Sequence, residues 1–69
     1  MVAYKVYFSE EAKFMRVNNL SRMDAIQFLC FDKDGSVLIY CNADKVEAVE
    51  YELRKAGRND FYCKWEKTY

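Results

Sequence analysis

Hydrophobic and polar positions alternate over two segments near the start of the chain, residues 2–8 and 13–17. The first segment is rich in β-branched and aromatic residues, which favour strands, and the second repeats its alternation. Residues 9–12, Ser-Glu-Glu-Ala, form a polar break between them. The pattern therefore predicts a β-hairpin at the start of the chain.

A largely apolar stretch follows the second segment and ends at the sequence Asp-Lys-Asp-Gly, residues 32–35. Ser21 and Asp24 are spaced like a capping box, and Leu20 and Ala25 stand where a hydrophobic staple would form. We therefore expect a helix over residues 22–31, which gives the element order ββαβαβ.

The sequence also permits a second order of helices and strands. The sequence of residues 32–35 also suits a type I turn closed by a left-handed glycine, which would join residues 27–32 and 36–41 in a hairpin. Ser9 would then cap a helix over about residues 10–23, and the order becomes βαββαβ, the ferredoxin-like pattern. This alternative places Asn18 and Asn19 inside a helix, where asparagine is unfavourable, and ββαβαβ is preferred for that reason.

The second half of the chain has a clearer pattern. Residues 36–41 predict a buried strand, and Asn42 is positioned to cap the following helix. That helix has one apolar stripe at helical spacing, formed by Val46, Val49, Leu53 and Ala56. Residues 60–67 alternate again as a final strand. We predict one small α+β domain over residues 1–69, with about four strands in a mixed or antiparallel sheet and two helices on one face.

The composition limits the classes of function that the protein can have. The 69 residues are 52% hydrophobic, too many for a disordered chain, and the 11 basic and 11 acidic residues cancel. A net charge of zero disfavours nucleic acid as the partner, because binding to a phosphate backbone depends on clustered cations. The longest aliphatic and aromatic run, residues 37–41, is too short to cross a bilayer, so no membrane association is expected.

The residues that usually carry chemistry are sparse. The chain has no histidine, two glycines and three cysteines, Cys30, Cys41 and Cys63, without a C-x-x-C motif. A nucleophile would lack its usual base, a phosphate loop lacks its glycines, and a metal site lacks its ligands. We expect no enzyme, no cofactor and no metal, and reduced thiols in a cytoplasmic protein.

Two helices can cover one face of a small sheet and leave the other face open. Apolar alternation assigns to the covered side Tyr4, Val6, Phe8, Met15, Val17, Val37, Ile39, Cys41, Phe61, Cys63 and Trp65. It assigns to the opposite side Lys5, Tyr7, Phe14, Arg16, Leu38, Tyr40, Tyr62 and Lys64.

Tyrosines with cations are common in contact surfaces, although cross-strand aromatic pairs also stabilise sheets without binding anything. The sequence therefore predicts a non-catalytic binding module, of adaptor or inhibitor type, for a protein partner or a second copy of the chain. Single-stranded nucleic acid on the same face is the alternative.

Overall fold

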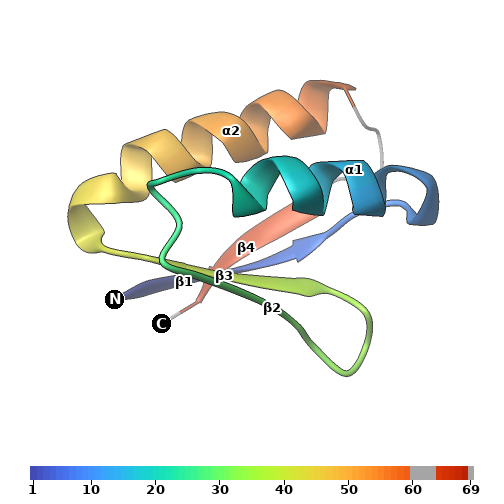
Figure 1. Ribbon diagram of the computed structural model, residues 1–69, viewed down its shortest axis with the longest axis horizontal. Coiled ribbons are helices and arrows are strands. Elements are labelled where there is room, and N and C mark those ends of the chain that lie inside the picture. Colours follow the sequence, from blue (N-terminus) through green and yellow to red (C-terminus); the bar gives the residue numbers. More distant parts are fainter. Residues whose placement is uncertain (60–63, 69) are drawn as a thin grey trace.

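The computed structural model describes residues 1–59 and 64–68. Its elements are β1 (Val2–Tyr7), α1 (Glu10–Ser21), β2 (Phe28–Phe31), β3 (Val37–Cys41), the 3-10 turn η1 (Ala43–Lys45), α2 (Val46–Asn59) and β4 (Lys64–Thr68). The strands form one sheet in the order β2-β3-β1-β4, and each neighbouring pair is antiparallel. Both helices lie on the same face of this sheet (Figure 1). The α+β class is thus confirmed, with four strands and two helices.

The preferred order ββαβαβ is wrong, because residues 10–21 form a helix and not the second arm of a hairpin. Ser9 caps this helix, and its Oγ accepts a hydrogen bond from the N–H of Ala12 at 3.2 Å. Glu10 and Glu11 occupy the first turn, where negative charge suits the helix dipole. A good cap and two acidic residues thus favour the helix.

Ser21, expected to begin a helix, is instead the last residue of α1. Its Oγ donates a hydrogen bond to the carbonyl oxygen of Asn18 at 2.8 Å. Asn18 and Asn19 therefore lie in the last turn, near the helix end. There their poor propensity costs less than it would in the middle of a helix.

The segment expected to be helical over residues 22–31 contains β2 instead, because the following turn closes a hairpin. The N–H of Asp32 donates to the carbonyl of Ser36 at 2.9 Å, and the N–H of Gly35 donates to the carbonyl of Asp32 at 3.1 Å. Gly35 has a φ of +86°, a conformation that favours glycine. The element order is therefore βαββαβ, the alternative that the sequence left open.

The core lies between the sheet and the helices. Its fully buried side chains are Tyr4, Val6, Val37, Ile39, Cys41, Val49 and Leu53, and Leu20 of α1 completes the cluster. The expected core positions of β1 and β3 are thus confirmed. Met15 was assigned to the core wrongly, because its segment is helical and its side chain is exposed; Phe61 and Cys63 lie outside the described residues.

Tyr4 links β1 to the neighbouring strand β4 and to the helix α2. Its ring meets that of Trp65 on β4 edge to face, with the centroids 5.6 Å apart. Its hydroxyl donates a hydrogen bond of 2.6 Å to Oε2 of Glu50 on α2. Arg54 donates to the other oxygen of this carboxylate at 3.1 Å, and Nζ of Lys67 lies 3.9 Å from Oε2. A charge-assisted bond therefore anchors α2 on the sheet.

The replacement Tyr4→Phe tests this anchor. We expect it to lower the free energy of unfolding by about 1.5 kcal/mol or more, because the lost bond has a charged acceptor. Urea unfolding followed by circular dichroism measures the change. Tyr51→Phe is the matched control, since Tyr51 is 64% exposed on α2. Equal stability of Tyr4→Phe and the wild type would contradict the prediction.

The caps give a second test. Ser9→Ala removes the side-chain acceptor at the start of α1 and should destabilise the protein by about 1 kcal/mol. Ser21→Ala removes only an exposed bond in the last turn and should change stability by less than about 0.5 kcal/mol. The same unfolding measurement compares the two variants. A larger loss in Ser21→Ala than in Ser9→Ala would be inconsistent with a helix that is capped by Ser9 and ends at Ser21.

Candidate interaction surface

The sheet face away from the helices is identified by the strand register, since directly opposed residues share a face. Lys5 pairs with Leu38 and Glu66, and Tyr40 pairs with Ala3 and Phe28. The complete set, which we call the open face, is Ala3, Lys5, Tyr7, Phe28, Cys30, Leu38, Tyr40, Lys64, Glu66 and Thr68. No described helix covers it (Figure 1).

The structure brings together on the open face five of the residues that the sequence assigned there: Lys5, Tyr7, Leu38, Tyr40 and Lys64. The assignment of Phe14 and Arg16 to the sheet is wrong, because both belong to α1. Their segment alternates like a strand, yet the cap at Ser9 makes it helical. Tyr62 lies outside the described residues.

Sequence reasoning missed Phe28 and Cys30, which β2 contributes to the open face. Both side chains are exposed, and Phe28 keeps 58% of its surface accessible. They were missed because the pattern of their segment also fits a buried helix. The turn chemistry of residues 32–35 was the signal that could have found them.

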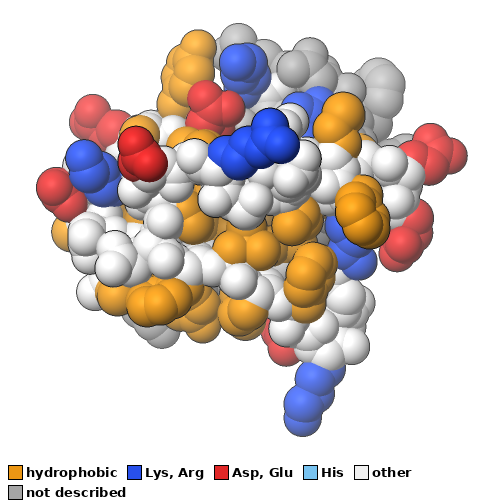
Figure 2. Space-filling model, viewed as in Figure 1, with side chains coloured by type: hydrophobic (Ala, Val, Ile, Leu, Met, Phe, Trp, Pro, Cys, Tyr) orange, Lys and Arg blue, Asp and Glu red, His pale blue; other side chains and the backbone are white. Residues whose placement is uncertain are grey.

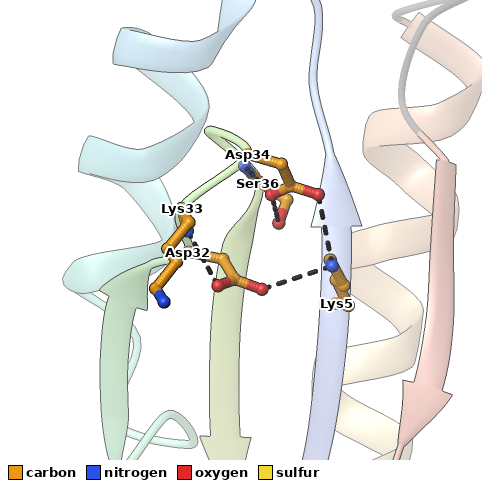
Figure 3. A network of polar contacts seen from close by, with 5 residues as sticks. All are labelled: Lys5, Asp32, Lys33, Asp34 and Ser36. Atoms are coloured by element: carbon orange, nitrogen blue, oxygen red, sulfur yellow. Dashed lines mark hydrogen bonds and ion pairs between the residues drawn. The ribbon is translucent and has the colours of Figure 1, made fainter.

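Two ion pairs hold the side chain of Lys5 on the open face (Figure 3). Its Nζ lies 3.2 Å from Oδ2 of Asp34 and 3.2 Å from Oδ2 of Asp32, both in the hairpin loop. It also lies 5.6 Å from the centre of the Tyr7 ring. Hydrogen bonds to Asp34, and next to Asp32, raise the pKa of Lys5 above its ordinary value. The lysine is therefore charged, and its two ion pairs compensate that charge.

Asp34 is fixed in turn by Ser36, whose Oγ–H and N–H donate to its Oδ1 at 2.6 and 3.0 Å. These bonds are the main reason that the pKa of Asp34 falls to about 2, and Lys5 adds to the effect. The N–H of Lys33 donates to Oδ1 of Asp32 at 2.7 Å. Hydrogen bonds thus order the loop between β2 and β3 internally, and ion pairs join it to Lys5 on the open face.

The two misassigned side chains line hollows beside α1. Arg16 lies in one of about 210 Å³ between α1 and α2, together with Glu52 and Lys55. Its Nε is buried without a hydrogen-bond partner among the described residues. Phe14 lines an apolar groove of about 400 Å³ on the other side of the helix, beside Phe31 of β2.

Candidate chemistry is limited in residues 1–59 and 64–68. No group of three acidic, cysteine or histidine residues in this part of the chain could hold a metal ion. Cys30 and Cys41 are free thiols, and burial raises the pKa of Cys41. No helix in the same ranges has the length and apolarity needed to cross a membrane. No protein-family model, curated protein or solved structure matches the chain.

The pKa of Asp34 is testable by carboxyl NMR titration. Since folding lowers this pKa from 3.8 to about 2, its contribution to stability is present above pH 4 and is lost as the pH falls towards 2. Ser36→Ala should raise the pKa of Asp34 towards 3.8 and weaken this dependence. Lys5→Met should raise the same pKa by a smaller amount. An unchanged pKa in Ser36→Ala would show that the hydroxyl of Ser36 is not its main cause.

Proposed function

We propose that this protein is a non-catalytic binding module, of adaptor or inhibitor type, that docks a protein partner on its open face. The observation that carries the proposal is a sheet face that no described helix covers, with Tyr7, Tyr40, Phe28 and Leu38 across three adjacent strands. Aromatic side chains in this arrangement supply a large contact area.

Rigidity supports the same function. Tyr7 is 39% exposed, and the ammonium of Lys5 lies near its ring while two carboxylates hold that ammonium in place. Tyrosine loses little conformational entropy on binding, since only two side-chain torsions are fixed. A partner would therefore meet a surface that is ordered before it binds, which lowers the entropic cost of association.

Charge favours a protein over single-stranded nucleic acid. Among the described residues, Lys5 and Lys64 are the cations of the open face, and Glu66 lies opposite Lys5 in the register. Asp32 and Asp34 already compensate the charge of Lys5. Binding of single-stranded nucleic acid depends on accessible cations beside stacking rings. The open face has few such cations that are not already compensated. Because Cys30 and Cys41 are both free, the setting we propose is the reducing cytoplasm.

The test compares the wild type with Tyr40→Ala and Tyr7→Ala as baits in a host extract, with bound proteins identified by mass spectrometry. A partner retained by the wild type should then be purified and its affinity measured. We expect each variant to lose about thirtyfold in affinity, which equals about 2 kcal/mol, because central tyrosines often dominate an interface.

Tyr51→Ala is the control, because it removes an equally large ring from α2 and leaves the sheet unchanged. Circular dichroism must first show that all variants fold. If folded Tyr40→Ala and Tyr7→Ala bind the partner as tightly as the wild type, the open face is not the docking site. Strong binding of a single-stranded oligonucleotide that weakens between about 50 and 200 mM salt would instead indicate the nucleic-acid function.

A further inference from the structure

The two edges of the sheet differ in chemistry. At one edge, β4 carries Lys64, Glu66 and Lys67, and charged side chains of this kind oppose pairing with another strand. At the other edge, β2 has the sequence Phe-Leu-Cys-Phe, without charge or proline. Among the described strands, only β3 pairs with β2, and the outer side of β2, which we call the β2 edge, is open to a further strand.

The hydrogen bonds of the hairpin show which backbone groups point to the β2 edge. The bond from Asp32 N–H to the carbonyl of Ser36 makes these two residues a hydrogen-bonded pair. Because such pairs alternate along an antiparallel ladder, Cys30 and Phe28 direct their N–H and C=O groups towards β3. Leu29 and Phe31 therefore direct theirs outward.

Exposed apolar side chains flank the β2 edge on both faces of the sheet. Phe28 lies on the open face and Phe31 on the helix face, with 58% and 59% of their surfaces accessible. Phe31 also lines the groove beside α1, where Phe14 is 90% exposed. Figure 2 shows hydrophobic side chains gathered on this side of the molecule, along α1 and β2.

We propose that the β2 edge binds the β2 edge of a second copy of this chain, in antiparallel pairing about a twofold axis perpendicular to the sheet. The strand suits its own copy, because it has no charges that would oppose each other in a self-pair. The pairing brings together two apolar edges and joins the sheets of both copies. It does not depend on the docking of a partner on the open face.

The backbone selects one register. A perpendicular twofold axis opposes residues of the same face, so Leu29 can meet either Leu29 or Phe31 within β2 of the second copy. The first choice would pair Phe31 with Gln27, whose N–H already donates to the carbonyl of Tyr40 at 2.8 Å. The second choice pairs each outward-pointing Leu29 with an outward-pointing Phe31 and is therefore the register of the dimer.

This register places Cys30 directly opposite Cys30 of the second copy. Because Cys30 directs its backbone groups to β3, the two cysteines form a non-hydrogen-bonded pair across the new interface, with Cα atoms about 4.5 Å apart. That separation lies within the range of disulfides, about 4.4–6.8 Å. Cys30 is exposed, so oxidation can report the contact.

The first experiment measures association of the full chain by sedimentation equilibrium, with a reductant present. The wild type should form dimers, and Phe31→Pro should raise the dissociation constant at least about a hundredfold. This substitution removes the outward N–H and the exposed phenyl ring of residue 31 but no hydrogen bond to β3. The circular dichroism spectrum should therefore remain unchanged. Tyr51→Ala, which removes a similarly exposed ring from α2, should dimerise like the wild type.

The second experiment tests the register by diamide oxidation in a Cys63→Ser background, with products separated on a non-reducing gel. Two Cys30 thiols lose two protons and two electrons to diamide and form one disulfide. We expect a dimer band from Cys30. The matched variant Phe28→Cys with Cys30→Ser should give none, because the two residues 28 would lie four positions out of register, about 13 Å along the strands.

A wild type that stays monomeric up to about 1 mM would overturn the proposal. So would a dimer that survives Phe31→Pro in a folded protein, since its interface would lie elsewhere. Equal cross-linking at positions 28 and 30 would also contradict it, because unspecific collisions would explain both. Dimerisation that Phe31→Pro abolishes, together with cross-linking at Cys30 alone, would establish the interface.

Discussion

The structure depends on β1, the strand that lies between β3 and β4 and makes contacts on both faces of the sheet. Tyr4 and Val6 are fully buried towards the helices, while Lys5 and Tyr7 point to the open face. The hydroxyl of Tyr4 reaches Glu50 on α2, and the ammonium of Lys5 reaches the loop between β2 and β3. One strand thus positions α2 on one side and the hairpin loop on the other.

The hairpin loop between β2 and β3 contacts the open face through Lys5. A turn closed by Gly35 brings Asp32 and Asp34 within 3.2 Å of Lys5, which lies on a strand that does not pair with β2. These ion pairs are partly exposed, so each contributes little to stability. Their consequence is electrostatic, because they leave an aromatic surface with little unbalanced charge. That property distinguishes the open face from a basic, stacking surface for nucleic acid.

Sequence patterns predicted the second half of the chain better than the first. Val49 and Leu53 at helical spacing identified the buried side of α2, although Asn42 precedes η1 and makes no capping hydrogen bond with its side chain. In the first half, the strand β1 was predicted correctly, but the segments that form α1 and β2 were not. α1 has no clear apolar stripe, because Phe14 and Met15 are exposed and Leu20 is its one buried residue in the described structure. The cap at Ser9 and the turn at residues 32–35 determine α1 and β2, and apolar patterns do not show them. The site residues on β1 and β3 were therefore found from the pattern, and those on β2 were missed.

Because α1 has no apolar stripe, aromatic rings on α1 and β2 stay exposed. A domain of this size buries only about 60% of the surface of its unfolded chain. The core cluster of the described residues is small. Phe14, Phe28 and Phe31 remain outside that core and lie at or beside the β2 edge. Antiparallel pairing of two such edges would bury further apolar area and provide partners for the outward backbone groups of Leu29 and Phe31. Small domains often gain stability from association with a second chain, because one small core supplies little of it.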